Sequence, residues 1–207
     1  MHPIPHMEKT LRQGLGKKRQ YEISAVQGFI SLILVMYIIA PLLHEFLHLI
    51  VLKITGCLYT IDLGFKWYAG IYGRVELFSS IGFIGTIILL GIGILGNLFL
   101  GSALFIHGRR MRLSGMHAES NVIAFTGLGF FLNPTSYFFS RSGDLMNILN
   151  LMHALDMSFL LPVVGFFMFL LALIYLYEHS SHIIEEYRRI RLIEKEIEYF
   201  LYDINSK

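Results

Sequence analysis

Residues 24–52 of the chain read SAVQGFISLILVMYIIAPLLHEFLHLIVL, with no Asp, Glu, Lys or Arg before Glu45. As a single helix this stretch would be about 43 Å long, whereas the hydrocarbon core of a bilayer is about 30 Å thick. The sequence therefore predicts an early membrane-spanning helix that is longer than the core. Pro41 lies inside the stretch and predicts a kink, because proline cannot donate a backbone hydrogen bond.

The composition extends this prediction to the whole chain. Apolar residues make up 55% of the 207 residues and charged residues only 15%, whereas about a quarter of a soluble domain is charged. Three further apolar segments follow, at residues 77–106, 121–139 and 159–177. We therefore expect an all-α polytopic membrane protein in a lipid bilayer, with about four transmembrane helices. The net charge of +2 is too small to indicate a nucleic-acid partner.

The second apolar segment, residues 77–106, is rich in glycine. Small residues at helical spacing allow helix backbones to approach closely in lipid. We therefore expect this helix to pack closely against its neighbours through Gly82, Gly85, Gly91, Gly93, Gly96 and Gly101.

Residues 57–76 differ in pattern from the apolar segments on either side. Along the first half, two sets of residues alternate: Leu58, Thr60, Asp62 and Gly64 with Tyr59, Ile61, Leu63 and Phe65. Enrichment in aromatic and β-branched residues, punctuated by glycine, is typical of a short β-hairpin. The alternative is an interfacial belt of aromatic side chains. A hairpin here would be an insert after the first transmembrane helix.

Polar segments flank the membrane-embedded part, which we place at residues 24–177. Residues 1–23 form a basic cytoplasmic head without the features of a cleaved secretory signal. Residues 178–207 are charged and carry an apolar stripe at helical spacing, interrupted by Glu194, which predicts an amphipathic helix. That helix would lie on the membrane surface or against a partner, or else be a solvated closing helix.

The basic residues are unevenly distributed over the connecting segments. They gather in the head, in the loop after residue 106 and in the tail, while the other two loops hold few. Because basic loops tend to stay on the cytoplasmic side, this distribution favours four crossings with both termini in the cytoplasm. We expect a multi-pass integral protein of the cell (plasma) membrane.

The motif His44-Glu45-Phe46-Leu47-His48 is the strongest functional signal. Residues at i and i+4 share one face of a helix, so the imidazoles of His44 and His48 can bind one Zn²⁺. Glu45 would then take a proton from the attacking water and pass it to the leaving amine. A charged side chain inside apolar sequence costs about 2.5–3.5 kcal/mol near the bilayer centre and usually marks function.

A catalytic zinc site needs a third protein ligand, and few acidic residues lie outside the tail. Asp144 follows the third apolar segment, and with four alternating crossings it lies on the same side of the membrane as His48. It is the favoured ligand, although His153 and Asp156 remain open. The alternative role for Asp144 is the N-cap of the helix that follows it. His117 precedes that segment and would lie on the opposite side.

This combination resembles the site-2 protease family of intramembrane zinc metalloproteases: a His-Glu-x-x-His motif in an early membrane helix, a strand-like segment, a glycine-rich helix, and Asn-Pro followed by Asp beside Gly. The resemblance covers residues 24–157. It implies that His44, His48 and Asp144 bind zinc. It also implies that Glu45 is the base, and it makes Asn133 a candidate substrate or oxyanion contact. The chain departs from the family in having Gly-Asp instead of Asp-Gly, a longer Asn-to-Asp spacing, and no PDZ or CBS module.

The functional prediction is therefore a membrane-embedded zinc metallopeptidase that carries out intramembrane proteolysis. Its substrate would be a membrane-associated protein or peptide, presented as an extended strand to residues 57–76. The alternative is a non-proteolytic metal-binding membrane protein, a transporter or an assembly factor, with a protease-like fold. Glu45 separates the two, because a metal carrier does not need a carboxylate beside its first ligand. A di-metal oxygenase would need several histidine clusters, and His44/His48 is the only one inside an apolar run.

Overall fold

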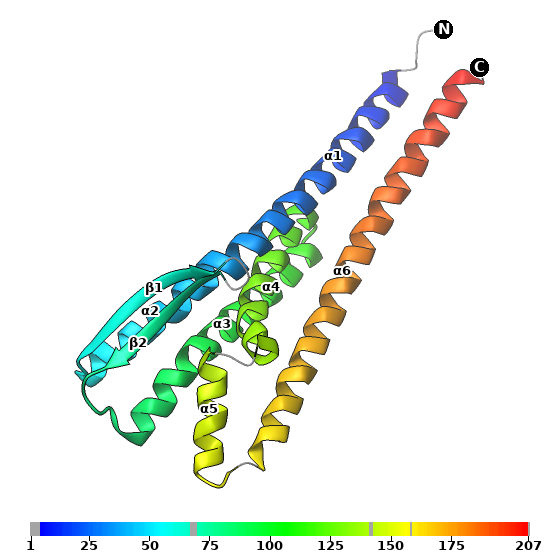
Figure 1. Ribbon diagram of the computed structural model, residues 1–207. Coiled ribbons are helices and arrows are strands. Elements are labelled where there is room, and N and C mark those ends of the chain that lie inside the picture. Colours follow the sequence, from blue (N-terminus) through cyan, green and yellow to red (C-terminus); the bar gives the residue numbers. More distant parts are fainter. Residues whose placement is uncertain (1–4, 67–69, 141–142, 158, 207) are drawn as a thin grey trace.

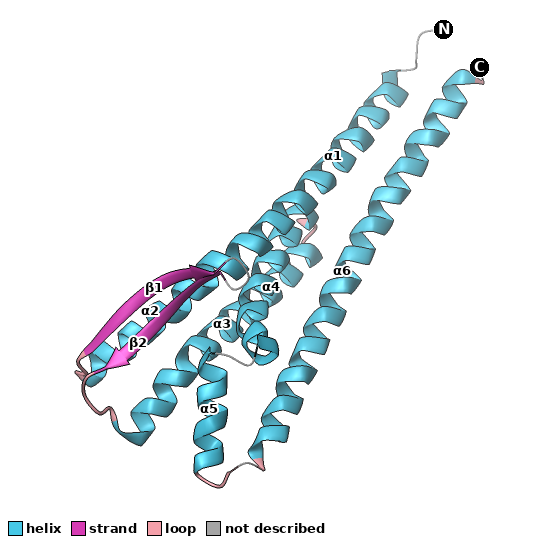
Figure 2. Ribbon diagram, viewed as in Figure 1, coloured by secondary structure: helices cyan, strands magenta, loops and turns pink. Residues whose placement is uncertain are grey.

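The computed structural model describes residues 5–66, 70–140, 143–157 and 159–206, and it is mostly helical (Figures 1 and 2). Two strands form an antiparallel sheet beside the helices. The elements in chain order are α1 (Pro5–Leu34), the π-helix η1 (Val35–Ile39), α2 (Ala40–Thr55), β1 (Tyr59–Lys66), β2 (Gly70–Leu77), α3 (Gly82–Leu113), α4 (His117–Ser140), α5 (Gly143–Ala154) and α6 (Leu160–Asn205).

The first helical rod consists of α1, η1 and α2, which follow one another without a break. The apolar stretch around Pro41 lies within Glu8–Thr55, a helical run of 48 residues. Immediately before Pro41 the chain adopts the wider π-helical turn, in which the Ala40 N–H donates to the Val35 carbonyl. The structure thus accommodates the proline, which has no N–H to donate, by a local change of helix type.

The predicted β-hairpin is confirmed. Strands β1 and β2 pair in register from Tyr59 opposite Leu77 to Lys66 opposite Gly70. Figure 1 shows the hairpin lying along α2. Gly64 lies opposite Tyr72, and a Cβ atom on Gly64 would come within 2.6 Å of the Tyr72 ring. The ring therefore covers the glycine and fills the space that a side chain would occupy.

Three helical runs are long and apolar enough to cross a membrane: Glu8–Thr55, α3, and the part of α6 from Gly165 onward. Among the described residues, α4 does not qualify, so the predicted count of four spans is not confirmed. Four polar side chains of α4 are buried: Ser120, Asn121, Asn133 and Thr135.

The expected close packing of the glycine-rich helix occurs between α3 and α4. A Cβ atom on Gly101 would lie 2.9 Å from the Gly127 carbonyl oxygen, and one on Gly127 would lie 2.9 Å from the Gly101 carbonyl oxygen. The two backbones therefore approach at a point where neither helix has a side chain. Beside this crossing, Leu128 and Phe131 pack with Tyr175 of α6 in a buried apolar cluster.

The fourth apolar segment and the charged tail form one helix, α6, which runs beside α1 toward the end of the molecule where both termini lie (Figure 1). Glu194, which interrupts the apolar stripe of the tail, pairs with Lys18 of α1 at 2.8 Å. Ile193 and Ile197 lie against Gly14. Part of the amphipathic face is therefore covered by the first helix of the same chain.

Candidate metal centre

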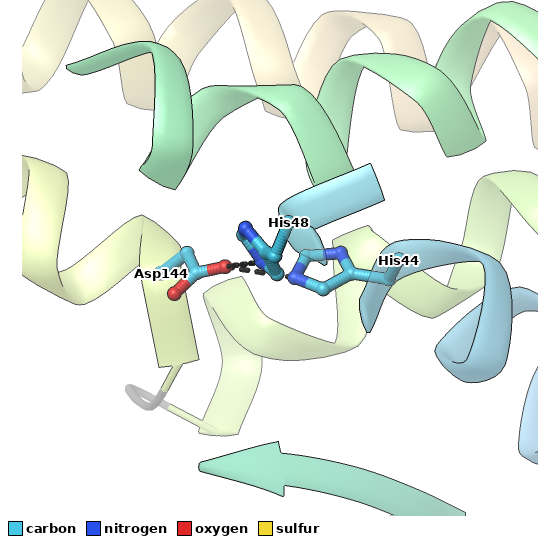
Figure 3. A group of neighbouring side chains, drawn as sticks. All are labelled: His44, His48 and Asp144. Carbon is cyan, nitrogen blue, oxygen red and sulfur yellow. Dashed lines mark hydrogen bonds and ion pairs between the residues drawn. The ribbon is translucent and has the colours of Figure 1, made fainter. Parts of the chain in front are cut away.

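Helix α2 places His44 and His48 one turn apart on a buried face. The two residues are 3% and 4% exposed, and their ring centroids are 4.6 Å apart. Asp144, in the first turn of α5, points its carboxylate at both rings (Figure 3). Asp144 Oδ2 lies 2.7 Å from His44 Nε2 and 2.8 Å from His48 Nε2. Residues 100 positions apart in sequence thus meet at one point.

These three side chains fit a zinc ion. One ligand atom from each lies within 4.8 Å of the others, and two imidazoles with one carboxylate form a ligand set of catalytic zinc sites, which keeps a fourth position open. No other group of three His, Cys, Asp or Glu side chains converges in this way in the described part of the chain. His153 and Asp156, the alternatives to Asp144, are not members of this cluster.

The environment of Asp144 favours its ionised form. Burial raises the pKa of this carboxyl group, but the hydrogen bonds and the charge interactions with the two imidazoles together outweigh it, so that the pKa falls to about 2. The side chain is therefore a carboxylate at neutral pH, as a metal ligand must be. Since α5 begins at Gly143, Asp144 lies inside the first helical turn.

Glu45 is held by the hairpin. Its Oε1 atom accepts a hydrogen bond of 2.9 Å from the Gly73 N–H on β2. A Cβ atom on Gly73 would lie only 2.2 Å from Glu45 Oε2, so a larger residue here would displace the Glu45 carboxylate from its present position. Glu45 is not part of the three-residue cluster, which leaves its carboxylate distinct from the candidate ligands.

Helix α3 packs against the imidazole rings of both histidines. A Cβ atom on Gly93 would lie 2.4 Å from His44 Nδ1, so the imidazole lies where a side chain of α3 would otherwise be. One turn earlier, the backbone of Leu89 interacts with the His48 imidazole. The sequence predicts that Gly93 packs against a helix, and the structure adds that it faces a candidate ligand.

Asn97 and Asn133 form a buried polar chain next to the π-helix. Asn97 Nδ2 donates to Asn133 Oδ1 at 3.0 Å and to the Ala40 carbonyl at 3.1 Å. Asn133 Nδ2 donates to the Met36 carbonyl at 3.2 Å. Asn133 is only 2% exposed, so its predicted contact with a substrate stays a prediction that would require this network to open. Asn97 was not among the residues predicted for the site, although an amide inside an apolar segment is a recognisable signal.

The similarity to the site-2 protease family rests on motifs alone. No family model matches the chain, and neither a curated protein nor a solved structure matches it. The zinc-binding roles of His44, His48 and Asp144 and the role of Glu45 as a base remain predictions. The geometry does bring the three candidate ligands to one point, with a carboxylate on the residue next to the first of them.

Proposed function

We propose that this protein is a membrane-embedded zinc metallopeptidase that hydrolyses peptide bonds of membrane-associated proteins or peptides, a compact enzyme of the site-2 protease type. One observation carries the proposal. Ligand atoms of His44, His48 and Asp144 converge within 4.8 Å, and Glu45 follows the first histidine directly. A site meant only to carry metal would need the three ligands but not Glu45.

The side chains divide the chemistry between them. His44, His48 and Asp144 would hold the ion, and Asp144 adds the negative charge that balances part of its charge. Zinc, when bound, supplies a Lewis acid that makes water more acidic and polarises a carbonyl group. Glu45 would accept a proton from the attacking water and deliver it to the amine that leaves. The Gly73 N–H orients the Glu45 carboxylate for this transfer.

The edge of β2 offers a place for the substrate. The Gly73 N–H bonds to Glu45 and so points away from the ladder with β1. An extended peptide that adds to this edge would have to form its backbone hydrogen bonds on either side of Gly73, whose N–H Glu45 already occupies, and would then lie beside the proposed base. This arrangement favours a substrate segment that has been unwound from a helix into a strand.

The proposed placement in the membrane has four crossings, with α4 as the additional one. The polar side chains of α4 are buried against other helices, so they would not face lipid, where they would be costly. Both termini lie at one end of the molecule (Figure 1), as an even number of crossings requires. The basic residues near the end of α3, among them Arg110 and Arg112, favour the cytoplasmic side for that end in the plasma membrane.

Replacing Glu45 by Gln tests the proposal. The variant should keep one zinc per chain and lose hydrolysis of single-span reporter substrates by about a hundredfold or more, because only proton transfer is removed. Glu76→Gln, on the exposed surface of the hairpin, is the matched control and should retain both zinc and activity. Mass spectrometry of the cleavage products and elemental analysis give the two readouts.

Two results would count against the peptidase. Hydrolysis by the Glu45→Gln variant at the rate of the unmodified protein would exclude Glu45 as the base. Stoichiometric zinc in the unmodified protein, with no cleavage of any membrane-anchored reporter, would favour the non-proteolytic alternative of a metal-binding transporter or assembly factor.

A further inference from the structure

Asn97 lies at the middle of α3 and is completely buried, with 0% of its surface exposed. An amide inside an apolar environment is costly unless it is hydrogen-bonded. Asn97 meets this requirement on its donor side, because its Nδ2 atom donates to the Ala40 carbonyl and to Asn133 Oδ1, while its buried Oδ1 atom accepts no hydrogen bond from the described residues. Both donor hydrogens of the side chain are thus directed at other helices.

The two acceptors belong to the elements that lead to the candidate ligands. Ala40 is the first residue of α2 and lies one helical turn before His44. Asn133 lies on α4, the helix that precedes α5 and its Asp144. Asn97 therefore links the helix that carries both histidines to the helix that leads to the third ligand.

The π-helix explains why one further carbonyl group in this network, that of Met36, accepts from a donor on another helix. In its hydrogen-bond pattern the N–H of one residue reaches the carbonyl five residues earlier, as Ala40 does with Val35. The next N–H would come from residue 41, but Pro41 has none, and the carbonyl at the corresponding position is that of Met36. Asn133 donates to this carbonyl instead. The network thus stabilises the π-turn that sets the direction in which α2 leaves it.

We propose that Asn97 is a positioning residue for the metal centre: by bridging Ala40 and Asn133 it fixes α2 relative to α4, and so holds His44 and His48 in register with Asp144. This inference rests on the proposed metal site. A zinc ion accepts ligand distances only within a narrow range near 2.0–2.2 Å. A small rotation of α2 against α4 would therefore be enough to weaken binding, although Asn97 itself does not contact the ion.

Asn97→Leu tests this role, since leucine has a similar volume but no donor. Zinc affinity, measured by chelator competition on the purified full-length chain, should fall about tenfold or more, the loss typical of groups that orient metal ligands. Asn121→Leu is the matched control, because Asn121 is also a buried asparagine, 8% exposed, near the start of α4. It should change zinc affinity by less than about twofold, even where the melting temperature of the metal-free protein falls as much as in Asn97→Leu.

A second variant, Asn97→Ser, keeps the proposal testable if Asn97→Leu does not fold. Asn97→Ser keeps one short donor that cannot reach both acceptors, and should lower zinc affinity by an intermediate amount. The effects of Asn97→Leu and Asn133→Leu should not add, because both residues act in one chain of hydrogen bonds. Native zinc affinity in Asn97→Ser and Asn97→Leu, or an equal loss in Asn121→Leu, would overturn the positioning role alone. Absence of zinc from the unmodified protein would overturn the metal site as well.

Discussion

The three candidate ligands are not equally enclosed. The side chains of His44 and His48 are 3% and 5% exposed, whereas that of Asp144 is 20% exposed. The two histidine side chains extend from α2 and pack against α3. The Asp144 carboxylate reaches them from the short helix α5. Asp144 is therefore the ligand whose substitution should disturb folding least and metal binding most selectively.

Asp144→Asn separates the ligand role from a helix-capping role. Asparagine caps helices about as well as aspartate, so a capping residue would show no change in zinc content. If Asp144 is a ligand, zinc affinity should fall at least about tenfold, the loss that changes in outer-shell groups already cause. Chelator competition measures the affinity, and a thermal melt of the metal-free protein checks that the fold is intact. Unchanged affinity would remove Asp144 from the site.

At the scale of single residues, local motifs could be predicted and contacts across helices could not. His44, Glu45 and His48 follow from one short pattern on one helix. Asp144 emerged only as one of three candidates, because its place depends on how far α5 folds back toward α2. Gly73 acquires its role only when the hairpin reaches Glu45, a contact across 28 positions of sequence.

At the scale of elements, α3 acts as the rigid backing of the site. Gly93 leaves room for His44 on one side of this helix, and Asn97, one turn later, bonds the start of α2. The same helix approaches the backbone of α4 closely at Gly101. Some of its glycines, such as Gly101, therefore allow close packing of helices, while Gly93 leaves space for a candidate metal ligand.

Gly93→Ala should lower zinc affinity by about tenfold or more, because its Cβ atom would lie 2.4 Å from His44 Nδ1 and displace the imidazole. Gly91→Ala is the matched control in the same helix, where the nearest atom to the new Cβ is Leu95 Cδ1 at 3.9 Å. It should keep native affinity and stabilise the chain by about 0.4–1 kcal/mol. Chelator competition on both variants checks this, and equal affinities would show that His44 does not need the space at Gly93.

Some elements could be predicted from pattern and others only from their surroundings. The alternation in residues 57–76 indicated a hairpin, with an interfacial aromatic belt as the alternative, since strand periodicity is a local property. A kink was expected at Pro41, but the π-helix before it depends on side chains of α3 and α4 that supply donors. The tail was expected to form a separate amphipathic helix, yet α6 continues from the apolar segment to Asn205 because no proline or glycine interrupts it after Gly165.

At the scale of the whole molecule, a helical protein with apolar spans could be predicted from composition, whereas the predicted number of four spans stays a prediction. A helix surrounded by other helices need not be apolar, and α4 shows this with its buried polar side chains. In the sequence, Glu194 interrupts an apolar stripe for no visible reason, but in the structure it forms an ion pair with Lys18 of α1. Such residues can be interpreted only once their neighbours are known.

The central claim is that this molecule binds one zinc ion through His44, His48 and Asp144. Zinc X-ray absorption spectroscopy with elemental analysis of the purified chain tests it most directly. The account predicts one zinc per chain with nitrogen and oxygen ligands at about 2.0–2.2 Å, two of them imidazoles, and loss of most zinc in His44→Ala and in His48→Ala. Three results would contradict it: a chain without zinc, a sulfur ligand (Cys57) at about 2.3 Å from the zinc ion, or full zinc content in either histidine variant.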